Sequence, residues 1–359
     1  MKLIRALTLT LTSAALIVAG PADKADTVKK GTFEKIKVHG KSLEGNLEGD
    51  AADRDVFIYL PPSYATSKTR RYPVVYFLHG YGINAERYWN IMTVPDAADK
   101  DISTGATREM ILVHPDAFTI YNGSMYSSSP TTGDWEAFIT QDLVSYMDSH
   151  YRTIANRDSR GLAGHSMGGY GTLRLAMKYP EVFSSIYAMS SCCLMNNPGA
   201  GRGSGAAKQP PPQANNDDKG KGKGKGGRGG GLGNVQFAEA AAWSPNPTNP
   251  PQFFDLPTKD GQVQPAIAAR WVANSPLAMV PQYVTNLKKL HSIAMDVGLQ
   301  DGLLATNQEM DQSLTQLGVT HTFETYEGDH NSRVKERFET KVLPFFSSQL
   351  AATAKSGRR

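Results

Sequence analysis

The fold of this chain is restricted first by a short glycine-rich sequence near its middle. Residues 164–168 read Gly-His-Ser-Met-Gly, with one more glycine after them, and they lie between a short apolar segment at 161–164 and a helical pattern at 170–179. A strand can pass directly into a helix only through a tight turn, and the residues two positions from the central one must then be small. The pattern therefore predicts a strand–turn–helix unit with the hydroxyl of Ser166 exposed at the turn.

Segments typical of strands and helices alternate along most of the remaining chain. The continuous apolar run at 74–78 is typical of a strand buried on both faces, whereas 33–38 and 55–60 alternate apolar and polar residues, as antiparallel edge strands do. Further strands are expected at 110–114, 184–189, 292–297 and 320–326, and helices at 135–151 and 334–342, the last one ended or kinked by Pro344. This order predicts an α/β fold: a mostly parallel central sheet with helices on both faces and antiparallel N-terminal edge strands.

One internal segment departs from this pattern. The chain has 359 residues and a net charge of +4, and residues 196–264 include a proline run and an alternation of glycine and lysine that cannot bury surface and repels itself. We therefore expect a single domain over 23–350, interrupted by a largely disordered insertion at about 196–264, with a flexible tail at 351–359. Within the insertion, 237–254 carries Trp243 and is expected to dock on the body. The favoured interpretation is a tolerated surface loop; the alternative is a weak electrostatic contact with anionic surfaces, and no nucleic-acid partner is expected.

The N-terminus has the features of an export signal. Lys2 and Arg5 precede an apolar stretch at 6–19, and Gly20 and Ala22 provide small residues for cleavage. We expect a signal peptide over 1–22 and a secreted or periplasmic protein. The alternative is a single anchor helix, which the shortness of the apolar stretch disfavours.

The sequence gives little indication of a disulfide or of a metal site. Cys192 and Cys193 are adjacent, and adjacent cysteines rarely close a disulfide because the ring strains the peptide between them. We expect both to be small, buried residues at a strand end. No zinc or dinucleotide motif is present, so no metal and no cofactor is expected.

A serine at such a turn becomes a nucleophile only if a base lies within hydrogen-bond reach. His330 follows the last predicted strand, in the loop sequence Glu-Gly-Asp-His-Asn, and the carboxyl ends of strands are where α/β sheets meet their ligands. His79 also follows a strand, but a packing role beneath its turn is expected for it. His165 is expected to point away from the Ser166 hydroxyl.

An acid must orient the imidazole, and two aspartates compete for this role. Asp296 lies within a predicted strand and Asp301 in the loop beyond it, so the loop position favours Asp301. The order Ser166, Asp301, His330 is also the order found in α/β-hydrolases.

The oxyanion of an acyl-transfer intermediate needs two hydrogen-bond donors. The backbone N–H of Met167 directly follows the nucleophile. The second donor is expected in the turn at 79–82, where Gly80 and Gly82 allow a sharp bend that turns the N–H of Tyr81 towards the site.

With these motifs the chain resembles the esterase D, or Putative esterase, family of α/β-hydrolases. The matching sequences are Leu-His-Gly-Tyr-Gly at 78–82, Gly-Asp-Trp-Glu at 133–136, Gly-His-Ser-Met-Gly-Gly at 164–169, residues 298–304 and Gly-Asp-His at 328–330. That family includes feruloyl esterases, S-formylglutathione hydrolases and mycolyltransferases. The resemblance implies an α/β-hydrolase fold and acyl transfer through an acyl-serine, and it supports Asp301, Tyr81 and Met167 in the roles above.

Substrate contacts are predicted less sharply. A polar and aromatic loop follows the strand at 110–114, so Tyr121, Asn122 and Tyr126 are candidates for the substrate pocket, with Trp135 beyond them. An ordinary surface loop is the alternative for this segment.

These observations leave three hypotheses for function. The first is an exported serine carboxylesterase acting on a small-molecule or glycan-linked ester, with feruloyl and acetyl esters as candidates. The second keeps the site but transfers the acyl group to a sugar hydroxyl. The third is a non-catalytic envelope-binding protein with a degenerate hydrolase fold.

Overall fold

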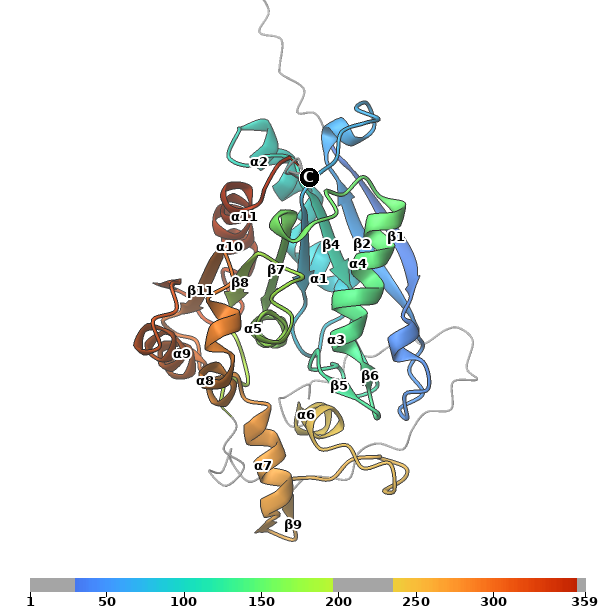
Figure 1. Ribbon diagram of the computed structural model, residues 1–359, viewed down its shortest axis with the longest axis vertical. Helices are drawn as coiled ribbons and strands as arrows, with labels where there is room; N and C mark the ends of the chain where they lie inside the picture. The colour runs from blue at the N-terminus through green and yellow to red at the C-terminus, as the bar shows by residue number, and fades with distance from the viewer. Residues whose placement is uncertain (1–29, 196–234, 354–359) are drawn as a thin grey trace, which may run out of the picture.

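The computed structural model describes residues 30–195 and 235–353. Its centre is one eight-stranded sheet with the strand order β1-β2-β4-β3-β7-β8-β11-β12 (Figure 1). The first two strands run antiparallel to their neighbours and the others are parallel. The strands are β1 (Thr32–His39), β2 (Asp53–Leu60), β3 (Val74–Leu78), β4 (Ile111–Pro115), β7 (Arg160–His165), β8 (Ser185–Met189), β11 (Ser292–Gly298) and β12 (Thr322–Tyr326).

Each predicted strand is present to within two residues, and the predicted α/β fold with antiparallel edge strands is confirmed. Two small hairpins lie outside the main sheet: β5 (Ser128–Ser129) with β6 (Gly133–Asp134), and β9 (Thr258–Lys259) with β10 (Gln262–Val263). None of the helices in the described ranges is long and apolar enough to cross a membrane.

Helices cover both faces of the sheet because the side chains of the central strands alternate between two apolar cores. In β3, Val75 and Phe77 belong to one core, while Val74, Tyr76 and Leu78 belong to the other. The first core is closed by α1 (Ala85–Met92), α2 (Val94–Ser103), α10 (Val334–Arg337) and α11 (Leu343–Gln349). The second is closed by α3 (Trp135–Ala137), α4 (Leu143–His150), α5 (Met167–Lys178), α8 (Pro276–Leu287) and α9 (Leu304–Gln316).

Two of the predicted helices contain a π-helical turn. Residues Phe138–Asp142 join α3 to α4, and Phe338–Val342 join α10 to α11. Pro344 does not end the second of these helical runs, which continues through α11 to Gln349. It lies in the first turn of α11, directly after the π-helical turn.

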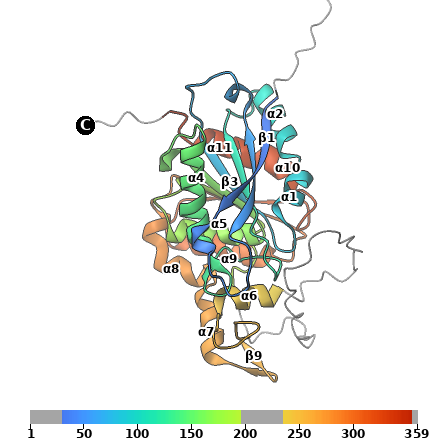
Figure 2. The same ribbon diagram turned by 90° about the vertical axis from the view of Figure 1, so that its right-hand side faces the viewer.

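The second half of the predicted insertion is folded, so the expectation of a largely disordered segment at 196–264 is wrong for residues 235–264. They form α6 (Val235–Trp243) and the β9–β10 hairpin, and α7 (Pro265–Ala273) follows (Figures 1 and 2). As expected for 237–254, this segment docks on the body: Phe237, Trp243 and Phe254 are all buried. Residues 1–22 and 196–234, to which the signal peptide and the lysine–glycine alternation belong, lie outside the described residues.

Ala351, the first residue of the predicted flexible tail at 351–359, is hydrogen-bonded to the body. The N–H of Ala351 donates to the carbonyl of Asp158, and its own carbonyl accepts from the hydroxyl of Ser159. The chain is therefore bound to the body at Ala351, and residues 354–359 lie outside the described part.

Candidate active site

Ser166 lies on the predicted tight turn between β7 and α5. Its backbone has φ 59° and ψ −115°, a conformation that residues other than glycine rarely adopt. A Cβ on Gly168 would lie 1.9 Å from the carbonyl oxygen of Leu78, and one on Gly164 would lie 2.4 Å from the backbone of Gly168. The two glycines are therefore required by close contacts between backbones, and they allow the turn that holds Ser166 partly exposed.

His330 and Asp301 meet Ser166 at the carboxyl edge of the sheet. The Nε2 atom of His330 lies 2.9 Å from the Oγ atom of Ser166, and its Nδ1 atom lies 2.8 Å from Oδ2 of Asp301. The side chain of Asp301 is 2% exposed and that of His330 is 31% exposed. The structure thus brings the three predicted residues into one chain of hydrogen bonds, in which Ser166 and His330 are partly exposed and Asp301 is buried.

Asp301 is held in place as an ionised acceptor. Burial opposes its ionisation, but hydrogen bonds from His330, from the N–H of Leu303 and from Ser190 outweigh burial and lower the pKa of Asp301. A carboxylate that stays ionised can fix the Nδ1 proton of the imidazole and stabilise the imidazolium form.

Asp296, the competing acid, has a different role. It is fully buried in β11, where it accepts hydrogen bonds from Nε of Arg337 and from the hydroxyl of Tyr187. Burial raises the pKa of Asp296 despite the neighbouring Arg337. This carboxyl belongs to an ion pair between the sheet and α10, and Asp301 is the aspartate that reaches His330.

The loops that carry Asp301 and His330 are bonded to each other. The N–H of Gln300 donates to the carbonyl of Gly328, and the Gln300 side chain accepts from the N–H of Gly328. A Cβ on Gly298 would lie 2.1 Å from that same carbonyl, so this glycine allows the loops to touch. Their contact fixes the relative positions of the acid and the imidazole.

His165 has a positioning role that the sequence analysis did not identify. Its Nε2–H donates to the carbonyl oxygen of His330 at 2.8 Å, and the two rings lie 4.7 Å apart. Burial, and secondarily the charge of His330, lowers the pKa of His165 to about 3, so the ring is neutral at ordinary pH. No local sequence signal reports this contact, because the partner lies 165 residues away.

His79 packs beneath the turn at 79–82, as predicted. Its Nε2 accepts from the N–H of Ala117, so the proton is on Nδ1, which lies 2.9 Å from the carbonyl of Gly80. The turn lies against the nucleophile: a Cβ on Gly80 would be 3.4 Å from Cβ of Ser166.

The two predicted oxyanion donors belong to segments that lie next to Ser166. Met167 begins α5, so its N–H belongs to the first turn, which the helix itself cannot pair. Tyr81 directly follows Gly80 in the turn against Ser166. A Cβ on Gly123 would contact both the Met167 sulfur, at 2.5 Å, and the Tyr81 ring, at 3.0 Å, so the loop at 119–126 packs on both residues.

The predicted substrate residues need correction. Trp135 is 1% exposed; its ring packs against Phe138 and its Nε1 donates to the carbonyl of Thr132, so it is a core residue. Tyr126 is fully buried, and its hydroxyl donates to the carbonyl of His79. The prediction that they line the substrate pocket is therefore wrong, because both side chains are buried in the apolar core.

Of the other two candidates, Tyr121 is buried and Asn122 is not. Tyr121 packs with Phe237 and Phe254, at ring distances of 6.4 and 5.4 Å. Asn122 is partly exposed and its carbonyl accepts from the N–H of Gly82. A substrate contact by Asn122 therefore stays a prediction, and Tyr121 instead anchors α6 over this edge of the sheet.

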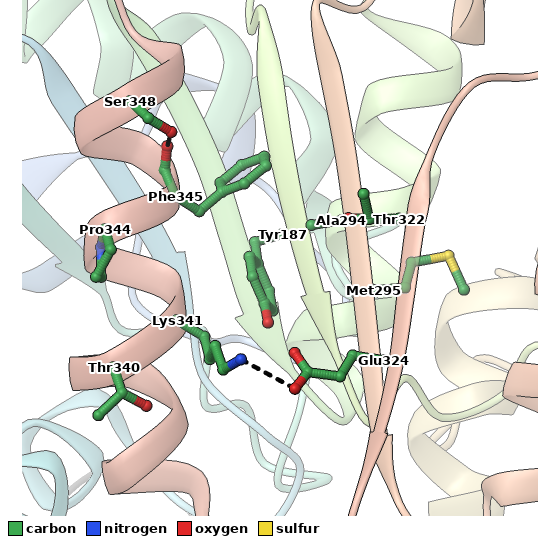
Figure 3. A pocket seen from close by; sticks show the side chains of 10 residues that line it. All are labelled: Tyr187, Ala294, Met295, Thr322, Glu324, Thr340, Lys341, Pro344, Phe345 and Ser348. Carbon is green, nitrogen blue, oxygen red and sulfur yellow. Dashed lines mark hydrogen bonds and ion pairs between the residues drawn. The ribbon is translucent and has the colours of Figure 1, made fainter.

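A pocket of about 350 Å³ lies elsewhere, between α11 and the strands β8, β11 and β12 (Figure 3). Its rim carries the ion pair of Lys341 with Glu324, at 2.9 Å, and Tyr187 and Phe345 line its interior. It contains none of the three hydrogen-bonded site residues. Among the described residues no group of three or more His, Cys, Asp or Glu side chains is placed to hold a metal ion.

Several known proteins are similar to this chain. Residues 51–342 match the family described as Putative esterase. An esterase of Mycobacterium tuberculosis, Rv1288, is 34% identical over 132 residues, and a xylanase/feruloyl esterase of Xylanibacter ruminicola is 31% identical over 132 residues. These matches cover 36% and 35% of this chain and only 27% and 18% of the relatives.

Among solved structures, a ferulic acid esterase superposes with a TM-score of 0.62 at 22% identity, covering 89% of this chain and 99% of that one. At this identity the superposition shows a shared fold. The family match spans the serine turn and both loops that reach it, and on that ground the chain belongs to the Putative esterase family.

Proposed function

We propose that this protein is an exported serine carboxylesterase that works through an acyl-serine intermediate. The observation that carries the proposal is the hydrogen-bond chain from Ser166 Oγ through His330 to Asp301, with both distances below 3 Å. A hydroxyl, an imidazole and a buried ionised carboxylate in this order form a nucleophile, a general base and the group that orients the base.

The reaction follows from these positions. His330 Nε2 takes the proton of Ser166 as Oγ attacks the ester carbonyl, and Asp301 stabilises the resulting imidazolium. The N–H groups of Tyr81 and Met167 donate to the oxyanion. His330 then protonates the leaving alcohol, and water releases the acid by the same steps in the second half of the reaction.

For substrate, we propose feruloyl or acetyl-type esters, including esters attached to glycans. The support is family membership and the feruloyl esterase among the relatives. Export is proposed from the signal-like N-terminus, which suits extracellular esters.

The test compares Ser166→Ala with the wild type in hydrolysis of 4-nitrophenyl acetate and methyl ferulate and in labelling by a fluorophosphonate probe. We expect loss of labelling and at least a 1,000-fold loss of kcat, since the nucleophile is absent. Thr66→Ala, on an exposed turn, is the matched control and should keep both. Near-normal turnover by Ser166→Ala would contradict the proposal, and analysis of the products should find the free acid.

A further inference from the structure

The two cysteines of the chain lie in contact directly beside the serine turn. Cys192 and Cys193 follow β8, and their Sγ atoms are 2.7 Å apart. In an extended chain consecutive side chains point in opposite directions, but Cys193 has φ 59°, which turns both side chains to the same side. Unbonded carbon atoms pack at about 3.5–4.0 Å and sulfur is larger than carbon, whereas bonded sulfurs are about 2.05 Å apart. The pair is thus already closer than two unbonded atoms usually come.

We propose that Cys192 and Cys193 are a covalent modification site, at which an oxidant of the disulfide class closes a disulfide between these adjacent residues. Adjacency alone disfavours such a bond, because most backbone conformations hold the two sulfurs apart. Here the backbone turn at Cys193 already holds the two sulfurs in contact.

The backbone around the pair is held from both sides. The N–H of Cys192 donates to the carbonyl of Ser166 at 3.1 Å. The side chain of the buried Asn307 bonds both the N–H and the carbonyl of Ser191, at 3.2 and 2.9 Å. These bonds fix the backbone that leads into the pair, so the two sulfurs are carried on a segment that is held in place.

The surroundings assign different roles to the two sulfurs. Cys192 is partly exposed, whereas Cys193 is 5% exposed and its Sγ lies 3.4 Å from Oε1 of the buried Glu239 in α6. Cys192 is therefore the thiol that a dissolved disulfide can reach, Cys193 is the one that resolves the adduct, and Glu239 is the base beside it.

The chemistry is a thiol–disulfide exchange in two steps. The Cys192 thiolate attacks one sulfur of the small disulfide, forms a mixed disulfide and expels one thiolate. Cys193 then gives its proton to Glu239 and attacks Sγ of Cys192, which expels the second thiolate. In sum, two protein thiols are oxidised, one disulfide is reduced to two thiols, and the two protons end on those thiols.

The test is intact-mass measurement of the reduced, full-length protein after exposure to oxidised glutathione, acid quenching and alkylation with iodoacetamide under denaturing conditions. Because the chain has only two cysteines, the masses are unambiguous. We expect a monomer that is lighter by two hydrogens and carries no alkyl group, and dithiothreitol should restore two alkylation sites. This readout is independent of esterase activity, so it can fail or succeed separately from the proposed function.

Variants separate the two steps. Cys193→Ser should stop at one glutathione adduct on Cys192, and Glu239→Gln should accumulate that adduct and close the ring at least several-fold more slowly. Two outcomes in the wild type would overturn the proposal: a stable glutathione adduct, or two alkylatable thiols under conditions in which Cys193→Ser becomes modified. The first outcome is read in the wild-type protein alone, so a variant that does not fold leaves the proposal open to refutation.

Discussion

At the scale of single residues, the site depends on positions where one added carbon is not tolerated. Ser166 adopts a positive φ that costs about 1–3 kcal/mol and is kept only because the surrounding chain holds it. Gly168 lies where the helix start touches the end of β3, and no side chain fits between them. The turn is therefore a property of the neighbouring glycines as much as of the serine.

Gly168→Ala should destabilise the protein by more than about 3 kcal/mol or prevent folding, because its Cβ would overlap a backbone carbonyl that cannot move freely. Urea unfolding measures the change. Gly302→Ala is the matched control, because nothing lies within 4 Å of its Cβ position. An alanine at 168 with wild-type stability would show that the turn is looser than described.

The two aspartates make a second comparison at this scale. Asp301→Asn should lower kcat about 1,000- to 10,000-fold with little change in thermal stability, because an amide cannot stabilise the imidazolium. Asp296→Asn should do the reverse, lowering the melting temperature by weakening the pairing with Arg337 while kcat falls less than tenfold. Measuring kcat and melting temperature for both variants tests the assignment, and equal losses of kcat would contradict it.

At the scale of elements, α6 is joined to the body through aromatic contacts and a few hydrogen bonds. The rings of Tyr121, Phe237 and Phe254 pack together, and Nε1 of Trp243 lies 3.3 Å from the hydroxyl of Ser127. Through the loop at 119–126 these contacts reach Tyr81 and Met167. The helix therefore buttresses the turns that carry the proposed oxyanion donors.

Phe237→Ala should lower the stability of the packing around α6 by about 3–5 kcal/mol, because it leaves a cavity among the three rings. The helix should then open more often. Hydrogen exchange followed by mass spectrometry should show faster exchange over 235–243, with the central strands unchanged. Val272→Ala, at an exposed position in α7, is the control. Unchanged protection of α6 in Phe237→Ala would mean that other contacts hold the helix.

At the scale of the whole molecule, two buried histidines make stability depend on pH. His114 is 1% exposed among aromatic rings, and neither ring nitrogen has a hydrogen-bond partner in the described structure. Burial, with a smaller contribution from His79, lowers the pKa of His114 to about 3, and burial also lowers that of His165 to about 3. Both rings are therefore neutral in the folded state and titrate near pH 6.5 once unfolded.

Because the unfolded state binds these protons and the folded state does not, stability should fall as pH drops from about 6.5 towards 3. Each such histidine contributes a slope of up to about 1.4 kcal/mol per pH unit. His114→Leu should still fold, and its free energy of unfolding should change less steeply with pH, because one proton fewer is taken up on unfolding. Urea unfolding between pH 7 and 4 measures the slope. His150→Gln, at an exposed position, is the control and should keep the wild-type slope. An unchanged slope in His114→Leu would contradict the argument.

Much of this protein can be read from local pattern. Strand segments differ from helical segments in the period of their apolar side chains. The spacing of the glycines predicts the serine turn, and the loops at strand ends indicate where Ser166, Asp301 and His330 lie. Each of these signals arises from a few neighbouring residues whose steric and solvation preferences act wherever the segment lies.

The burial and the hydrogen-bond partners of other residues depend on which segments, distant in the sequence, pack against each other. Trp135 and Tyr126 are predicted as pocket residues from their loop sequence, but both are buried in the core. The helix α6 follows a segment without apolar periodicity, yet it is buried. His165 donates to a carbonyl 165 residues away. The two cysteines are unpromising by adjacency, and only the turn at Cys193 brings their sulfurs together. Composition and spacing do not encode such contacts, because burial and hydrogen-bond partners are set by the packing of the whole chain.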